Sequence, residues 1–169
     1  MLGDIFVSSR GDAFRYKRLL GTKSIAPPRF ELLEWKGITD VDFSVLWATL
    51  LNEPFDPKRH QLIDLVFHSH ETTVLGKLRM KAAVLGAMAR ELMGGESEPT
   101  FLYAFPPKLV EALTHLSANE VPRVVETWLH VLEKPDDRGP EFIDGLSQIL
   151  NLATIANSRS RTIYLWLGV

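Results

Sequence analysis

The chain contains no cysteine among its 169 residues. This absence excludes a disulfide framework, a thiolate zinc site, a cysteine-ligated cluster and a cysteine nucleophile. It says nothing about the cellular compartment. Imidazole and carboxylate groups remain as the metal ligands that the sequence offers, and the chain has 5 histidines to supply them.

The sequence also lacks a large charge excess and a long apolar run. Its formal net charge of −2 argues against binding nucleic acid with the whole surface. No window of about 18 or more apolar residues exists, so we expect no membrane-spanning helix. Asp4 and Arg10 interrupt the apolar start, so we expect no secretory signal. These absences predict a soluble, cytoplasmic protein that binds neither membrane nor nucleic acid.

Phosphate-binding loops and nucleophile motifs are missing as well. No Gly-x-Gly-x-x-Gly or Walker pattern occurs, and the serines lack the context of a nucleophile elbow. We therefore expect no cofactor.

What is present is a regular arrangement of apolar residues. Short runs of aromatic and β-branched residues predict strands, and longer runs with helical spacing predict helices. The predicted strands are Ile5–Ser8, Phe30–Trp35, Leu62–Phe67, Phe101–Phe105 and Ile163–Leu167. The predicted helices are Asp12–Leu20, Asp40–Leu51, Thr73–Met93, Pro107–Leu116, Glu120–Glu133 and a further helix that begins near Pro140.

Two of these helices have recognisable N-terminal signals. Thr39 is a suitable N-cap for the helix at 40–51, with Asp42 favoured in the first turn by the helix dipole. For the helix at 120–133, Ser117 and Asn119 compete as N-cap. We prefer Asn119, because Pro122 then falls in the first turn, where its missing N–H is not needed.

The order of elements predicts the fold class. Strands and helices alternate at first, but three consecutive helices precede the last strand and spoil a regular doubly wound pattern. We therefore expect a single α+β domain over residues 1–169, with α/β as the alternative. A mixed sheet of four or five strands would pack against about six helices.

Four hydrophobic stretches carry a family resemblance. They are the opening Gly-Asp-Ile-Phe-Val-Ser-Ser, the segment Val45–Leu51, the stretch from Pro107 to Trp128, and the closing Ile163-Tyr-Leu-Trp-Leu. Their order resembles a loose group of small, uncharacterised bacterial α/β proteins with a Pro-x-x-Leu-Val helix, a Trp-ended helix and a terminal Tyr-Leu-Trp strand. The resemblance covers about half of the chain and implies a fold, with no known activity to transfer.

The sequence His68-Ser-His70-Glu71 is the candidate for chemistry. Two histidines two positions apart on an extended segment face the same way, so both imidazoles can bind one metal ion. Glu71 could act as a base or as a third ligand, and His60 lies at the other end of the same predicted strand. A catalytic zinc site normally needs three protein ligands. The alternative is a polar strand exit that leads into a helix cap at Thr73.

Charge is distributed unevenly along the chain. The first 30 residues are mainly basic, and the stretch from Glu91 to Asp144 is mainly acidic. Arg15 and Arg18 are three residues apart and so adjacent on a helix. Two interpretations stay open for them, a basic partner surface and a solvated face, and Trp166 would join such a surface if its strand face is exposed.

These observations favour a non-catalytic binding or interaction protein of bacterial type, acting on a protein partner. The alternative is a small enzyme or metal-binding protein that uses His68, His70 and Glu71. A third reading is the subunit of a homo-oligomer, which would bury more than about 1,000 Å² in its interface. The biochemical activity itself stays unknown from sequence.

Overall fold

The structure is a computed structural model that describes residues 2–13, 31–65, 100–134 and 136–168. The strands are β1 (Leu2–Ser8), β2 (Leu32–Lys36), β3 (Ile63–Asp64), β4 (Thr100–Ala104) and β5 (Thr162–Gly168). The helices are α2 (Asp40–Leu50), α5 (Pro107–His115), α6 (Val121–Val131) and α7 (Gly139–Ser158), with a 3₁₀ turn η1 (Asp136–Arg138). None of the described helices is long and apolar enough to cross a membrane.

The strands form one sheet in the order β2-β1-β5-β4-β3. Every pairing between them is antiparallel, so the expected mixed sheet is corrected to an antiparallel one. The reason lies in the connection from β4 to β5. Helices α5, α6 and α7 leave the end of β4 and bring the chain back to the same end of the sheet, where Phe105 N–H donates to the Ile163 carbonyl at 2.9 Å.

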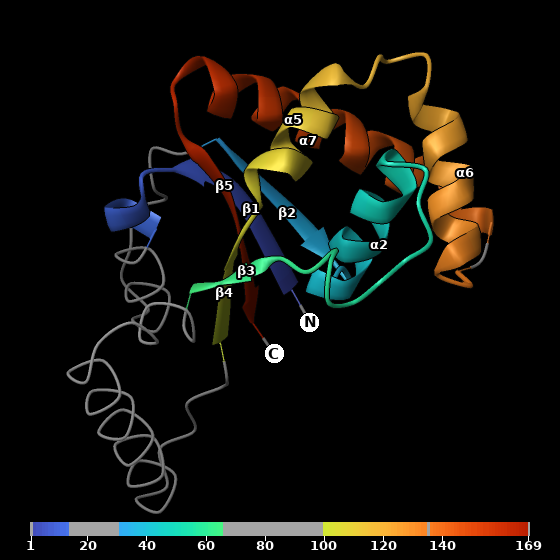
Figure 1. Cartoon of the computed structure of the whole chain (residues 1–169), viewed down its shortest axis with the longest axis horizontal. Helices are drawn as coiled ribbons and strands as arrows, with labels where there is room; N and C mark the ends of the chain where they lie inside the picture. The colour runs from blue at the N-terminus through green and yellow to red at the C-terminus, as the bar shows by residue number, and fades with distance from the viewer. Residues whose placement is uncertain (1, 14–30, 66–99, 135, 169) are drawn as a thin grey trace, which may run out of the picture.

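The middle of the sheet joins the two ends of the chain. β1 and β5 pair from Leu2 opposite Gly168 to Ser8 opposite Thr162. The two termini therefore lie side by side at one end of the sheet (Figure 1). The opposite end of this strand pair, at Ser8 and Thr162, borders the candidate site.

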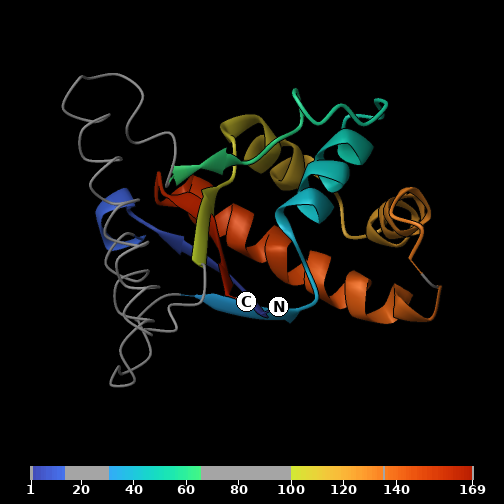
Figure 2. The same cartoon turned by 90° about the horizontal axis from the view of Figure 1, so that it is seen from below.

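The helices cover one face of the sheet (Figure 2). Alternate residues of the strands, such as Ile5, Val7 and Leu165, join a large apolar core with residues of α2, α5, α6 and α7. At its centre the Trp35 ring meets Trp128 and Phe142 edge to face, with centroids 6.1 and 5.1 Å apart. These aromatic contacts fix the helical layer against the sheet.

The other face of the sheet carries a second, smaller core. Phe6 and Tyr164 stack with their ring centroids 5.7 Å apart, and both residues are buried. Ala13, Leu65, Leu102 and Ala104 complete this cluster. The described part of the sheet is therefore buried on both faces along β1, β5 and β4, which explains its long apolar runs.

The expected α+β fold and all five expected strands are confirmed, although the third strand is reduced to Ile63–Asp64. The described residues contain four complete α-helices, one 3₁₀ turn and a helical segment at 10–13, so fewer complete helices are described than the six expected. The predicted helix at 73–93 and most of the one at 12–20 lie outside the described residues.

The two predicted helix caps have opposite outcomes. Thr39 is the N-cap of α2, and its hydroxyl and the Asp42 carboxylate form a reciprocal capping box. The choice of Asn119 for α6 is wrong, because the N-cap is Glu120 and it makes no side-chain cap bond. The Glu120 carboxylate instead accepts hydrogen bonds from the backbone and hydroxyl of Ser117, which close the preceding turn.

Candidate functional site

The metal ligands and the basic pair predicted from the sequence are not among the described residues. His68, His70 and Glu71 lie outside the described residues, and so do Arg15 and Arg18. Within the described ranges, no group of three or more histidines and carboxylates could hold a metal ion.

His60 is described, and it has a local structural role. Its side chain is buried, and Nδ1 accepts the backbone N–H of Asp56 at 3.1 Å. Nε2 lies 3.3 Å from a carboxylate oxygen of Glu53, and the ring packs edge to face on Trp47. Both ring nitrogens are thus occupied by the loop between α2 and β3, so His60 is not placed as a metal ligand.

Trp166 lies on β5 and is only partly buried. Its ring packs against the smaller core, while its Nε1 is buried and lacks a hydrogen-bond partner in the described part of the chain. The side chain therefore contributes mainly to packing, and whether any of its surface meets a partner stays a prediction.

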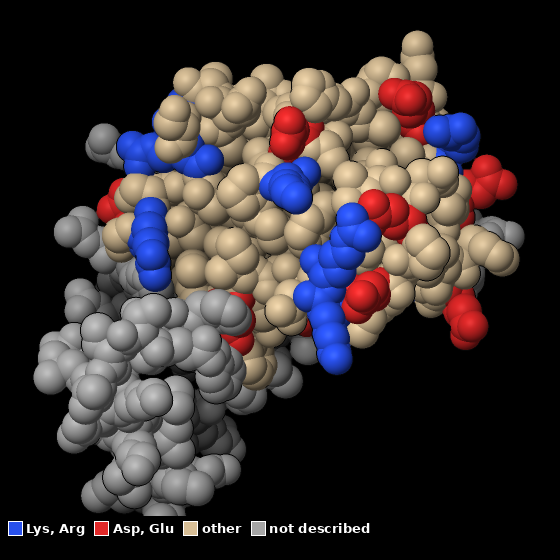
Figure 3. All heavy atoms as spheres, in the orientation of Figure 1, with Lys and Arg blue, Asp and Glu red and all other residues tan. Residues whose placement is uncertain are grey.

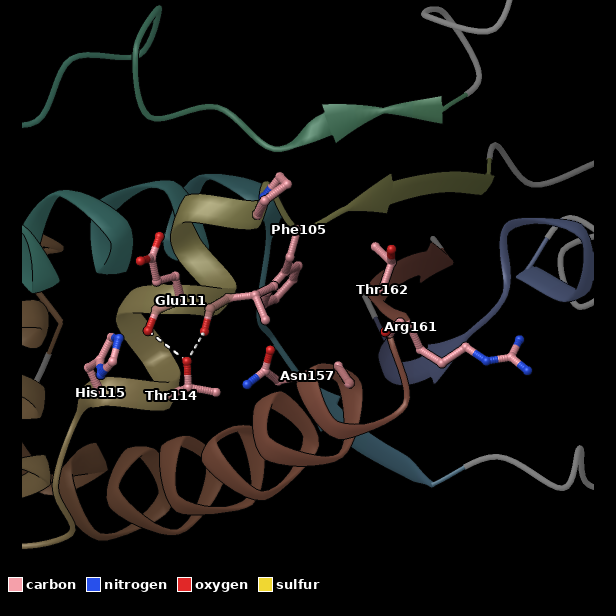
Figure 4. Close-up of a pocket in the computed structure, with 11 residues that line it drawn as sticks. Phe105, Glu111, Thr114, His115, Asn157, Arg161 and Thr162 are labelled. Carbon is pink, nitrogen blue, oxygen red and sulfur yellow. Dashed lines mark hydrogen bonds between the residues drawn. The ribbon is translucent and has the colours of Figure 1, made fainter.

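Three neighbouring hollows lie around the end of α7 and the start of β5. The largest of them lies between α5, the end of α7 and the start of β5 (Figure 4). We call it the α5–β5 groove, and its volume is about 600 Å³. It is lined by Phe105, Pro107, Val110, Glu111, Thr114, His115, Ala156, Asn157, Ser160, Arg161 and Thr162. Apolar side chains and polar groups from three elements thus meet around one space.

The end of α7 determines where the groove's polar residues lie. Ser160 has a φ of 49°, and Arg161 N–H donates to the Ala156 carbonyl at 2.8 Å. Ser160 N–H donates to the Asn157 carbonyl, which completes a Schellman motif without glycine. This turn directs the chain into β5, so the backbone of Arg161 and Thr162 is held rigidly at the groove.

The α5 side of the groove presents Glu111 and His115, which are four residues apart and both exposed. Thr114 lies between them, and its hydroxyl is used within the helix, at 3.0 Å from the Val110 carbonyl and 2.7 Å from that of Glu111. The groups available to a ligand on this side are therefore a carboxylate and an imidazole, not the threonine proton.

A second hollow of about 360 Å³ adjoins the groove. We call it the Tyr164 lobe, and it shares Phe105, Pro107 and Thr162 with the groove. Burial raises the pKa of Tyr164, while a hydrogen bond with Thr162 and the charge of Arg10 act in the opposite direction. The phenol therefore stays protonated at neutral pH and keeps its capacity to donate a hydrogen bond.

A third hollow, which we call the Ser8 hollow, adjoins the other side of Arg161 and measures about 160 Å³. It is lined by Val7, Ser8, Ser9, Asp12, Glu31, Arg159 and Arg161. Arg159 pairs with Glu31 at 3.1 Å. In the described part of the chain, Arg161 forms no ion pair, and Figure 4 shows its side chain pointing away from Glu111 and His115.

Basic side chains gather over the end of α7 and the start of β5, at the upper left of Figure 3. The arginines that line the hollows there are Arg10, Arg159 and Arg161. The last two were missed in the sequence, because they lie beyond the acidic stretch at 91–144 and far along the chain from the basic first 30 residues. The sequence signal for these two residues is Arg-Ser-Arg directly before β5. Only the pairing of β5 with β1 places these arginines beside Ser8.

An acidic group lies near the β3–β4 pair. Burial, together with the charges of Asp40 and Asp64, raises the pKa of Tyr103 to about 12. Burial also raises the pKa of Asp40, although hydrogen bonds from backbone N–H groups oppose it. These shifts follow from packing and like charge, and no described hollow of comparable size to the groove brings the three side chains together.

The fold and groove together define an antiparallel α+β protein with a ligand-sized hollow beside its central strand pair. Comparison of the chain with protein-family models, curated proteins and solved structures finds no match. The groove is therefore the feature from which a function can be inferred, and the resemblance to small bacterial proteins stays a prediction.

Proposed function

We propose that the protein is a non-catalytic binding protein that takes a small polar ligand in the α5–β5 groove. The observation that carries this proposal is the groove itself, which holds about 600 Å³ beside three independently positioned sets of polar groups. Pockets for small ligands typically measure about 300–1,000 Å³ and combine apolar walls with a few convergent polar groups.

The lining residues fit recognition. Phe105, Pro107 and Val110 offer apolar surface, and Asn157 offers an amide with two donors and an acceptor. Glu111 and His115 add groups that can hydrogen-bond to a polar ligand. Such a set fixes the orientation of a ligand, as the polar groups of binding pockets commonly do.

The same residues favour binding over nucleophilic chemistry. Nucleophilic catalysis needs a hydroxyl in hydrogen-bond contact with a base that a third group orients. Thr114 instead gives its proton to helix carbonyls. Among the described residues, no hydrogen bond joins His115 to a carboxylate that would orient it.

The proposal keeps the cytoplasmic location predicted from the sequence. It replaces a protein partner by a small ligand, because a stable protein interface buries about 1,200–2,000 Å² and would extend well beyond this groove. A protein partner is the outcome to consider if the groove accepts no small molecule.

The test is a screen of small polar compounds by ¹H–¹⁵N NMR, with two matched variants. Asn157→Trp fills the groove from the last turn of α7. Thr154→Trp places the same ring on an exposed position of the same helix, outside the groove lining. We expect a binding compound to shift the amides of residues 111–115 and 157–162 in the wild type.

We expect Asn157→Trp to weaken binding by at least about tenfold, equivalent to about 1.4 kcal/mol, and Thr154→Trp to bind normally. Equal binding by both variants would refute the groove as the site. Amide shifts confined to another face would refute it in the same way.

A further inference from the structure

Ser8 contains a buried hydroxyl that lacks a partner. The residue is 3% exposed, and its Oγ has no hydrogen-bond partner in the described part of the chain. A buried hydroxyl without a partner carries a desolvation cost, so such a group usually indicates a bound water, ion or ligand. Ser8 lines the Ser8 hollow, where a ligand atom could accept its proton.

Arg161 contributes a guanidinium to the same hollow. No described carboxylate pairs with it, and its backbone is fixed by the Schellman motif at the end of α7. The planar fork of an arginine matches phosphate and carboxylate oxygens in a bidentate arrangement. An unpaired guanidinium beside an unpartnered hydroxyl therefore favours an oxyanion.

The two carboxylates that line the hollow already have partners. Glu31 pairs with Arg159 at 3.1 Å, and Asp12 accepts a hydrogen bond from the Ser9 hydroxyl at 2.7 Å. Arg159 offsets the charge of Glu31, whereas Asp12 keeps its negative charge beside a neutral hydroxyl. The four formal charges that line the hollow therefore sum to zero, and Arg161 is the cation there that no described carboxylate pairs with. Arg10 adds a further positive charge on the adjoining Tyr164 lobe.

The size and position of the Ser8 hollow also suit a small anionic group of a ligand that lies in the groove. Its 160 Å³ equals about five water volumes, which accommodates a compact group such as phosphate. Ser8 and Thr162 face each other across β1 and β5, and Thr162 lines the groove. Since Arg161 lines both hollows, a ligand in the groove could extend one end to Ser8.

We infer that the Ser8 hollow binds the oxyanion of the groove ligand, a phosphate or carboxylate group, through Arg161 and Ser8. This inference deepens the proposed function and depends on it for the rest of the ligand. The oxyanion site itself can be measured alone, because inorganic phosphate and acetate contain the recognised group without the remainder.

The experiment titrates the full chain with inorganic phosphate, or with acetate, at constant ionic strength, and follows amide shifts and the melting temperature. We expect saturable shifts at residues 8–9 and 160–162 with a Kd of about 1 mM for at least one anion. The anion that binds more tightly identifies the source as phosphate or carboxylate.

Arg161→Gln should weaken anion binding by about tenfold, because a neutral amide replaces the bidentate charged contact. Arg123→Gln removes an exposed arginine of α6 outside the Ser8 hollow and should bind like the wild type. Equal losses in the two variants would mean that phosphate responds only to net charge, and would overturn the inference.

Ser8→Ala separates a ligand contact from a structural role. Without anion, its melting temperature should equal or exceed that of the wild type, because an unpartnered buried hydroxyl is removed. With anion, the gain in melting temperature should be smaller than in the wild type. A variant that melts lower in plain buffer but keeps the full anion gain would refute the role of Ser8.

The two proposals fail separately. Anion binding that depends on Arg161, with no larger compound found in the groove, would support the oxyanion site and refute the groove proposal. A groove ligand that binds Arg161→Gln as tightly as the wild type would support the groove proposal and refute the oxyanion site. The absence of saturable binding of either anion at about 10 mM would overturn the oxyanion site.

Discussion

Replacing Gly145 by alanine should destabilise the protein, although alanine is the better helix former. Gly145 lies within α7, and a Cβ at this position would be less than 3.0 Å from three ring carbons of Trp35. Real Cβ atoms are essentially never found closer than 3.0 Å to another heavy atom. Either the Trp35 ring or the helix must therefore move.

The Trp35 ring has little freedom to move. Trp35 is 4% exposed, and its Nε1 donates a hydrogen bond to Glu141 at 2.9 Å. Its ring meets Phe43, Trp128 and Phe142 at centroid distances of 6.4, 6.1 and 5.1 Å. Because interiors are close-packed, a shift of this ring disturbs all three neighbours.

Two effects of opposite sign decide the magnitude. Alanine gains about 1 kcal/mol over glycine in a helix interior. Inserting a methyl group into a well-packed core costs about 1–3 kcal/mol, and occasionally more. Contacts this short against a rigid ring place the cost at or above the upper end, so we expect a net loss of about 2 kcal/mol. For a chain of this length that loss lowers the melting temperature by about 4–8 °C.

Urea unfolding followed by circular dichroism measures the difference. Gly139→Ala is the matched control, because a Cβ there meets no atom within 4 Å, and it should be neutral or stabilising. In a Trp35→Phe background the smaller ring should make Gly145→Ala nearly neutral, which isolates the contact. The reasoning is refuted if Gly145→Ala is as stable as Gly139→Ala in the otherwise wild-type chain.

Two other predictions concern charged groups. Asp42 closes the capping box with Thr39 and pairs with Lys134 at 2.7 Å. Asp42→Ala should therefore lower the free energy of unfolding by about 3 kcal/mol, measured by urea titration. A loss no larger than that of Lys134→Gln would contradict this. A hydrogen bond from Arg138 holds the pKa of Glu141 below its ordinary value of 4.5. The resulting stabilisation is present above that value and is lost as the pH falls through the folded-state pKa. Glu141→Gln should therefore flatten the decline of the urea midpoint on the acid side. A midpoint that falls with pH as in the wild type would count against this prediction.

The sequence predicts much of the fold because local signals agree with the final packing. The Thr39 cap, the apolar stripe of α6 and the aromatic content of β5 each act over a few residues and survive in the structure. The start of α6 could not be predicted, because Ser117 binds the Glu120 side chain instead of capping the helix. Strand order is likewise not encoded locally, since it depends on pairings between distant segments.

The candidate site is less predictable for the same reason. Arg161, Asn157 and Glu111 come from separate elements, and only the return of α7 to the sheet brings them around one hollow. The unusual state of Ser8 depends on burial and a missing partner, and neither is visible in a sequence. The sequence-predicted residues His68, His70 and Glu71 lie outside the described residues, so their metal site stays a prediction.

The pairing of β1 with β5 also constrains how the chain folds during its synthesis. β1 leaves the ribosome before the other described strands, but its full-length neighbour is β5, which is made after all of them. Contacts between such distant segments give a high contact order, which slows folding. Until β5 emerges, β1 has an unpaired edge that could associate with other nascent chains. Chaperone binding to the growing chain should therefore persist until the final strand has been translated.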